Sequence, residues 1–418
     1  MNSHAFAPRP PHGWLRLGHL AIAACFVLLL GSVGCGRHIL GPDSIGSSGE
    51  MSALAASRSP DSLCARQLTA PAHLTGTSGS GALWVIDVPA NWNGDLVVYL
   101  HGYTNPAQPI ALPNNGAIRD SLLALGFAVT ASSYASNGYA VREGVQDSRR
   151  LSALFASRFG RPQHTYLFGV SLGGLVGLIL TQQYPDLYDG SLLVCGIVGG
   201  SRAQVEYVGD VRALFDAVYP GVLPGGLEHP PVVTDINAQV VQPVLTAVQS
   251  NPQGVGIIQA LLRHPLPGAT GQEIVGSLVT VLGFSMQGGG DLFERTHRQS
   301  YFDNTGYRYT SAALPVATID DINARVARYS ATPEARSFLT RFGEPNGPFR
   351  IPVISLHTTR DPVVPLSHED RLAQEAAGPM LVQRRVERYG HVAFSVGEMV
   401  ASFEDLVAWA GARHKRAA

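Results

Sequence analysis

Hydrophobic and polar positions change their period repeatedly between residues 83 and 195. Short apolar runs rich in β-branched and aromatic residues predict strands, and between them apolar residues recur every three or four positions, as on one face of a helix. Gly126, Gly160 and Pro185 end the helical segments. The predicted strands are 83–88, 95–100, 127–132, 165–170 and 191–195, and the predicted helices are 117–125, 145–159 and 172–184.

This alternation lapses after residue 195 and returns at residue 351, with strands predicted at 351–357 and 381–386 and a closing helix at 396–409. Alternating strands and helices favour an α/β fold, with a mostly parallel sheet covered by helices on both faces. The predicted core therefore comprises residues 82–195 and 351–412.

The intervening segment, 196–350, is far too long for an ordinary crossover between two strands. It contains helical pieces, such as 238–249 and 257–263, broken by Pro and Gly clusters, and few strand signals. We therefore expect a mainly helical cap, in which the Gly-rich stretch 287–291 forms a flexible turn. Because both ends of the cap emerge near one sheet edge, we expect its apolar pieces at 240–248 and 278–284 to govern substrate choice, or else to form the core of the cap itself.

The first 81 residues have a different character. Arg9 and Arg16 precede an apolar run over 20–30 that ends in small residues, as in a secretory signal peptide over residues 1–35. The run is shorter than a membrane span requires, so export is favoured over a permanent transmembrane helix. Residues 36–81, rich in Gly, Ser, Ala and Pro, predict a flexible linker.

The four cysteines have different expected fates. Cys25 leaves with the signal peptide, and Gly34-Cys35 resembles the end of a bacterial lipobox, although Ser32 stands where such a signal prefers Leu. Cys35 is therefore either the lipidated first residue of a membrane-anchored protein or close to an ordinary cleavage site of a secreted one. Cys64 and Cys195 remain, and either pair as a disulfide or leave Cys195 as a buried thiol.

Composition excludes several kinds of chemistry. The net charge is −1, with 30 basic and 31 acidic residues and no basic stripe, so we expect no nucleic-acid partner. Lys415 is the single lysine among 418 residues, which removes Schiff-base chemistry and phosphate binding of the Walker type. The sequence has no Cys-x-x-Cys or Cys/His cluster with metal-ligand spacing, so neither a metal nor another cofactor is expected.

The segment Gly169-Val170-Ser171-Leu172-Gly173 follows a predicted strand and opens a predicted helix. In that setting it predicts a nucleophile elbow, in which glycines let strand and helix approach closely around a strained serine. The alternative is an ordinary strand-to-helix turn with a serine cap.

At this point the chain resembles an α/β-hydrolase, over roughly residues 82–410 apart from the cap. His101-Gly102-Tyr103 matches the oxyanion loop of that family. The resemblance implies that the backbone N–H groups of Tyr103 and Leu172 point at the developing oxyanion, and that His101 is structural. His101 is disfavoured as the catalytic base because it precedes Ser171, whereas the family orders its triad Ser, Asp or Glu, His.

The resemblance also locates the acid and the base. Asp361 follows a predicted strand and precedes a Val-Pro pair, where the family places its acid; Glu369 and Asp370 are the substitutes. His391, in Tyr389-Gly390-His391, follows the last predicted strand and comes after both the elbow and the acid. The alternative for His391 is a solvent-facing loop histidine.

These residues predict an exported serine hydrolase, and in particular a carboxylic-ester hydrolase that uses Ser171, Asp361 and His391 through an acyl-enzyme. Its partner would be a small-molecule or polymeric ester. A serine peptidase or aminopeptidase of the same fold is the first alternative, and a non-catalytic binding protein the second.

Overall fold

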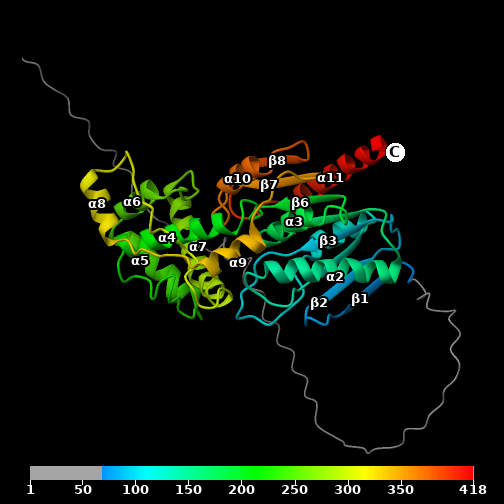
Figure 1. The fold of residues 1–418 in the computed structure, drawn as a ribbon, viewed down its shortest axis with the longest axis horizontal. Coiled ribbons are helices and arrows are strands. Elements are labelled where there is room, and N and C mark those ends of the chain that lie inside the picture. The colour runs from blue at the N-terminus through cyan, green and yellow to red at the C-terminus, as the bar shows by residue number, and fades with distance from the viewer. Residues whose placement is uncertain (1–67, 418) are drawn as a thin grey trace, which may run out of the picture. The chain divides into compact units, whose positions relative to one another are not determined.

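A computed structural model describes residues 68–417 (Figure 1). These residues form one eight-stranded sheet in the order β1-β2-β4-β3-β5-β6-β7-β8. β1 and β2 pair antiparallel with each other, and β2 pairs antiparallel with β4, whereas every pair from β4 to β8 is parallel. The strands are β1 (Ala72–Thr77), β2 (Leu83–Val88), β3 (Leu96–Leu100), β4 (Ala128–Ser132), β5 (Thr165–Val170), β6 (Gly190–Val194), β7 (Val353–Arg360) and β8 (Leu381–Tyr389).

Helices cover both faces of this sheet, as the alternating pattern predicts. Alternate residues of β3 show the division: Leu96 and Val98 belong to the hydrophobic cluster under α2, α3 and α10, whereas Val97 and Tyr99 belong to the cluster under α1 and α11. These helices are α1 (Gly116–Ala124), α2 (Val141–Phe159), α3 (Leu172–Gln183), α10 (Ser367–Glu375) and α11 (Val396–Ala417). The expected α/β-hydrolase fold class is confirmed.

The predicted helical cap lies between β6 and β7, and Figure 1 shows its helices grouped beside the strands in green to yellow. They are α4 (Ser201–Val218), the π-helix η2 (Asn237–Val241), α5 (Gln242–Ser250), α6 (Gln253–Leu261), α7 (Gly271–Arg295), α8 (Val316–Arg325) and α9 (Pro333–Gly343). Among the residues that the structure describes, no helix is long and apolar enough to cross a membrane.

Two expectations about irregular segments are wrong. The predicted linker 36–81 extends too far, because β1 occupies Ala72–Thr77 and pairs with β2. As an edge strand it exposes every second residue, so its Thr and His positions look like linker in the sequence. The signal peptide 1–35, the remaining linker and Cys64 lie outside the described residues.

The second correction concerns the Gly-rich stretch 287–291, which is helical and belongs to α7. Each helical glycine costs about 1 kcal/mol relative to alanine. At one of these positions the missing side chain makes room for a neighbour: a Cβ on Gly289 would lie 2.8 Å from the hydroxyl of Tyr301. Tertiary packing therefore overrides the local preference for a turn.

Candidate active site

Ser171 lies at a sharp turn between β5 and α3. Its backbone has φ 57° and ψ −120°, a left-handed conformation that costs a non-glycine residue roughly 1 to 3 kcal/mol. The Ser171 N–H donates to the carbonyl of Val194 at 2.9 Å, so the neighbouring strand holds the strained residue in place. The side chain remains partly exposed.

The two glycines of the elbow are required by close backbone approach. A Cβ on Gly169 would overlap the carbonyl oxygen of Gly173, and a Cβ on Gly173 would overlap the carbonyl oxygen of Leu100. Strand β5, helix α3 and the end of β3 therefore meet with no space for a side chain between them. The sequence prediction of a nucleophile elbow agrees with this geometry.

Asp361 follows the last residue of β7 and is fully buried. Its Oδ1 accepts the N–H groups of Val363 at 2.8 Å and Val364 at 3.0 Å, which fixes the plane of the carboxylate. Burial by itself would raise the pKa of Asp361. The charge and hydrogen bond of His391, together with His357, outweigh burial and hold the pKa below its usual value.

His391 follows β8 in a loop that is tied to the end of β7. Gly390 has φ 114°, which lets the chain turn sharply after the strand. Its N–H donates to the carbonyl of Arg360 at 3.0 Å, and its carbonyl accepts the hydroxyl of Thr358 at 2.7 Å. These bonds place the loop of His391 directly beside the loop of Asp361.

The structure brings the three predicted residues together. The Ser171 hydroxyl donates to Nε2 of His391 at 2.8 Å, and Nδ1 of His391 donates to Oδ2 of Asp361 at 2.7 Å. Both distances are within the range of good hydrogen bonds. Such a chain can move a proton from the hydroxyl to the imidazole while the carboxylate stabilises the resulting positive charge.

The predicted oxyanion residues flank Ser171. A Cβ on Gly102 would lie 3.1 Å from Cβ of Ser171, so the loop that carries Tyr103 reaches the nucleophile. Leu172 is the first residue of α3, and an N–H at that position has no acceptor within its helix. Gly102 and Leu172 thus lie beside Ser171, and the role of the Tyr103 and Leu172 N–H groups as oxyanion donors stays a prediction.

His101 has a structural environment. Its ring is 8% exposed, stacks on Tyr134 with centroids 3.9 Å apart, and donates from Nδ1 to the carbonyl of Gly102 at 2.7 Å. Burial lowers its pKa, so the ring stays neutral. These contacts fix the oxyanion loop from behind and agree with the structural role expected for His101.

The substitute acids are engaged away from His391. Glu369 is fully buried and accepts hydrogen bonds from Ser355 at 2.5 Å and Gln383 at 2.6 Å. Asp370 forms an ion pair with Arg385 at 2.9 Å. Both lie in the first turn of α10.

Cys195 lies beneath the triad, with its Sγ and ligand atoms of Asp361 and His391 all within 4.8 Å of one another. That spacing is short enough for a metal site. However, the thiol is fully buried, and burial raises its pKa well above the usual value, which opposes the thiolate that a metal would bind. The donor set therefore fits a hydrogen-bonded triad better than a metal centre.

One face of α7 joins the cap to the loops of the site. Near the start of the helix, the hydroxyl of Tyr389 donates to the carbonyl of Glu273 at 3.1 Å. In the middle, Phe284 packs edge-on against Tyr103 with centroids 6.0 Å apart. Near the end, Asp291 accepts a backbone N–H at 2.6 Å from the loop after β4. α7 therefore extends from the end of β8, before the loop of His391, past the loop that carries Tyr103.

The two apolar cap pieces behave differently. Val240, Val244 and Val248 are buried, and η2 and α5 contact α6 and α7, so the piece 240–248 belongs to the core of the cap. In the piece 278–284, Phe284 remains partly exposed on the side of Tyr103.

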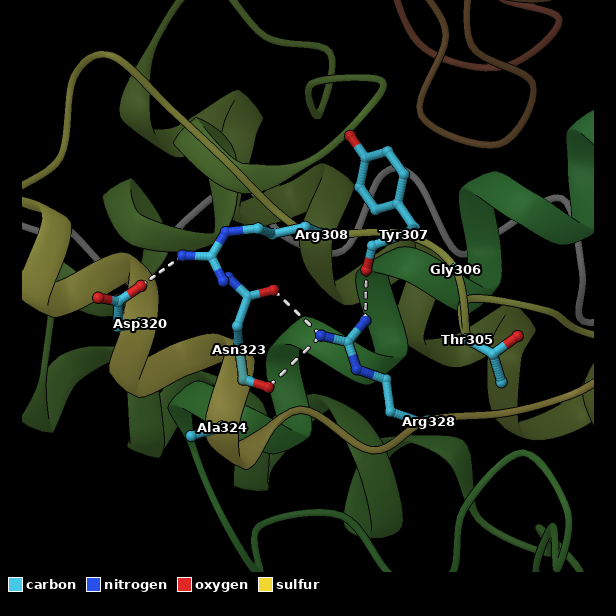
Figure 2. A pocket seen from close by; sticks show the side chains of 8 residues that line it. All are labelled: Thr305, Gly306, Tyr307, Arg308, Asp320, Asn323, Ala324 and Arg328. Atoms are coloured by element: carbon cyan, nitrogen blue, oxygen red, sulfur yellow. Dashed lines mark hydrogen bonds and ion pairs between the residues drawn. The ribbon is translucent and has the colours of Figure 1, made fainter.

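Figure 2 shows a cavity of about 460 Å³ in the cap, which none of the three triad residues lines. Its two guanidinium groups are already engaged: Arg308 pairs with Asp320, and Arg328 donates to the carbonyl of Tyr307 and to Asn323. This cavity therefore offers no free cation for an anionic ligand.

A second cavity, of about 540 Å³, lies next to the oxyanion loop. It is lined by segments 105–107 and 229–233 and by α7, including Met286 and Phe293. Segment 105–107 begins two residues after Tyr103, and none of the three triad residues lines this mixed apolar and polar space.

The chain is similar to a known protein family. Residues 68–321 match the tannase-like family of unknown function (DUF6351). The match includes the elbow and most of the cap and ends before β7. No curated protein matches the chain.

Several solved structures have a similar chain path. Feruloyl esterase B from Aspergillus oryzae is 13% identical with a TM-score of 0.41, over 77% of this chain and 74% of its own. Mouse alpha/beta hydrolase domain-containing protein 10 is 12% identical with a TM-score of 0.37, over 81% and 98%. The esterase EaEST from Exiguobacterium antarcticum is 14% identical with a TM-score of 0.36, over 81% and 98%. Likeness at this level carries no conclusion about activity.

The family match extends over more than half of the chain and includes both the strained elbow and the oxyanion loop. The chain belongs to the tannase-like family of unknown function, with the fold of the α/β-hydrolase superfamily.

Proposed function

We propose that this protein is a serine hydrolase that cleaves carboxylic esters through an acyl-enzyme. The observation that carries the proposal is the hydrogen-bonded chain from Ser171 through His391 to the buried Asp361. In the first step, the Ser171 oxygen attacks the acyl carbon while Nε2 of His391 takes the hydroxyl proton. The N–H groups of Tyr103 and Leu172 stabilise the oxyanion, at about 3 kcal/mol for each donor.

Collapse of that intermediate breaks the bond to the alcohol, which leaves with the proton from His391. Water then attacks the acyl-enzyme, gives one proton to His391, and the second collapse releases the acid as Ser171 regains its proton. Asp361 remains ionised throughout and stabilises the imidazolium that forms twice in each cycle.

A neighbouring cavity bears on the size of the ester. The cavity next to the oxyanion loop has about 540 Å³ and a mixed lining that includes Met286 and Phe293 beside Asp291 and Glu294, and we propose that it takes one part of the ester. The tannase-like description of the family agrees with a hydrolase.

The test combines a covalent probe with turnover. A fluorophosphonate should label Ser171, and Ser171→Ala should lower kcat for p-nitrophenyl esters by about 10³- to 10⁶-fold, or ~4 to 8 kcal/mol. Ser157→Ala is the matched control, because this exposed α2 hydroxyl donates only to the carbonyl of Leu154, and it should leave turnover unchanged. Labelling of another serine, or near-normal turnover of Ser171→Ala, would contradict the proposal.

The same assay separates the two alternatives. Turnover of aminoacyl or peptidyl anilides in preference to esters would indicate a peptidase, since the triad is equally competent on amides. Neither turnover nor labelling would indicate a binding protein that keeps the fold.

The proposal includes export, with Cys35 either lipidated or near the cleavage site. The support is the charged and apolar pattern of residues 1–35. Mass spectrometry of the mature N-terminus tests it: a diacylglyceryl group on Cys35 supports a membrane anchor, an unmodified start nearby supports secretion, and an intact Met1 contradicts both.

A further inference from the structure

A second pair of a carboxylate and an imidazole lies directly behind Asp361. His357 and Glu369 are both fully buried, and Nδ1 of His357 is 3.3 Å from Oε1 of Glu369. On its other side, Nε2 of His357 is 3.7 Å from Oδ2 of Asp361, the same oxygen that accepts the hydrogen bond from His391. Together with Ser171, the side chains form one continuous series of five polar groups.

The contacts indicate where the protons lie. Nε2 of His357 is 2.8 Å from the carbonyl of Val364, which can only accept, so Nε2 carries a proton. An unprotonated Nδ1 would place its lone pair 3.3 Å from a carboxylate oxygen that already accepts from Ser355. That arrangement is repulsive, whereas a protonated Nδ1 makes an ion pair with Glu369. His357 is therefore best described as an imidazolium.

Other elements packed around His357 contribute no competing charge. From α10, His368 accepts the N–H of Gly199 at Nδ1, and burial, helped by the charge of His357, lowers its pKa to about 3. From α4, the Tyr207 hydroxyl donates to the carbonyl of Pro362, and burial keeps this phenol neutral. From β6, the Cys195 thiol is neutral as well. The net charge of the buried cluster is thus −1.

The pKa directions agree with this description. Burial alone would lower the pKa of His357, but the hydrogen bond and charge of Glu369 and the charge of Asp361 outweigh it and raise the pKa. Burial would raise the pKa of Glu369, but His357 holds it below its usual value. Two buried carboxylates flank the same ring of His357, and a positive charge on that ring favours the ionised form of both.

We propose that His357, held as an imidazolium by Glu369, is a positioning residue that keeps Asp361 ionised and oriented toward His391. The proposal rests on the triad of the proposed function. His357 touches no substrate and acts through Asp361. The proton transfer from Ser171 would then depend also on the charges of two residues outside the triad, His357 and Glu369.

The first experiment removes the charges singly and together. His357→Gln keeps a donor for the carbonyl of Val364 but leaves two carboxylates without their cation. We expect a 10- to 100-fold loss in kcat/KM and a shift of the acid limb of its pH profile to higher pH by about one unit, because the surplus negative charge favours protonated His391. The double variant His357→Gln/Glu369→Gln restores the net charge and should recover the native limb.

The matched control is His164→Gln, which breaks a histidine–carboxylate pair with Asp95 at 3.0 Å, at residues that lie before β3 and β5. It should leave the acid limb in place. Thermal unfolding of each variant checks that the fold is retained. An unshifted limb in His357→Gln, or equal losses in the single and the double variant, would overturn the proposal.

The second experiment measures the charge of His357 without turnover. In ¹⁵N-histidine NMR of the native protein, both ring nitrogens of His357 should carry protons from pH 6 to 8, and Glu369→Gln should abolish this state at pH 8. A neutral ring in the native protein would overturn the proposal. Failure of the proposed function differs: Ser171 would then resist the fluorophosphonate in every variant, while the NMR result would stand on its own.

Discussion

Asp361→Asn is the substitution that isolates the role of the buried carboxylate. The side chain has no solvent exposure, its Oδ1 accepts two backbone N–H groups, and its Oδ2 faces Nδ1 of His391. Asparagine has nearly the same shape, and its amide oxygen can keep both backbone hydrogen bonds. Its NH₂ group then takes the place of Oδ2 and donates to His391.

The consequence is a wrong tautomer. An imidazole that accepts at Nδ1 carries its proton on Nε2, which lies 2.8 Å from the Ser171 oxygen and can no longer take the proton of that hydroxyl. In a catalytic triad this exchange costs about 10⁴-fold in kcat, or ~5.5 kcal/mol. Binding should change little, because Asp361 is buried and touches no substrate.

The assay is steady-state hydrolysis of p-nitrophenyl acetate, with thermal unfolding to verify the fold. Asp370→Asn is the matched control, because Asp370 lies nine residues further on, in an exposed ion pair with Arg385, and should change kcat less than twofold. If folded Asp361→Asn kept kcat within tenfold of the native value, or if Asp370→Asn lost as much, the assignment of the acid would be refuted.

Three further substitutions or conditions test the fold around the site. Arg295→Ala removes the bond to Asp291 within α7 and the bond from α7 to the carbonyl of Asn137, and should lower the unfolding free energy by about 2 kcal/mol in urea denaturation. The native protein should lose stability as the pH falls below about 4. Asp361 and Glu369 have depressed pKa values, so their contribution to the unfolding free energy disappears when they are protonated, and urea midpoints at pH 6, 4 and 3 measure this loss. Gly173→Ala should abolish soluble folding, whereas Gly256→Ala, on an open helix face, should stabilise by about 0.5 to 1 kcal/mol in thermal unfolding.

Each of these has its own contradicting result. Arg298→Ala is the control for Arg295→Ala, because it breaks an exposed ion pair with Glu294. If both substitutions lowered the unfolding free energy equally, the contacts of Arg295 with the core would not be the source of the stability. A midpoint that does not change between pH 6 and 3 would contradict the depressed carboxyl pKa values. A soluble, active Gly173→Ala would show that the elbow is less crowded than the contacts to Leu100 imply.

The elements that the sequence predicted well share one property: their signals are local. The elbow is five consecutive residues at the junction of a strand and a helix, Asp361 is the first residue after β7, and His391 is the second residue after β8. Parallel strands bring such carboxyl-terminal positions to one edge of the sheet, so their meeting follows from topology. The predicted ends of the elements differ from the observed ends mainly where a strand or helix continues beyond its apolar residues. For example, β7 ends at Arg360 rather than at residue 357.

The features that were missed depend on tertiary contacts. β1 is an edge strand whose alternation mixes Thr, His and Gly, and the glycines of α7 lie in a helix in which the Tyr301 hydroxyl packs closely on Gly289. His357 closes a predicted strand, and nothing in the spacing indicates that its ring pairs with Glu369. Twelve residues and a loop separate them, and only the packing of α10 on β7 and β8 brings them together.

The position of α7 has a consequence for how substrate choice can vary in this fold. The helix contacts Tyr389, two residues before the proposed base His391, and Tyr103, in the loop beside the proposed nucleophile, through the same face. A displacement of α7 would therefore move both loops and disturb the triad together with the oxyanion donors. Under the proposed function, we expect changes in substrate preference at side chains that line the second cavity, such as Met286 and Phe293. The piece 240–248, buried within the cap, can affect substrates only by shifting α7, so its substitutions should lower stability and turnover together for every ester.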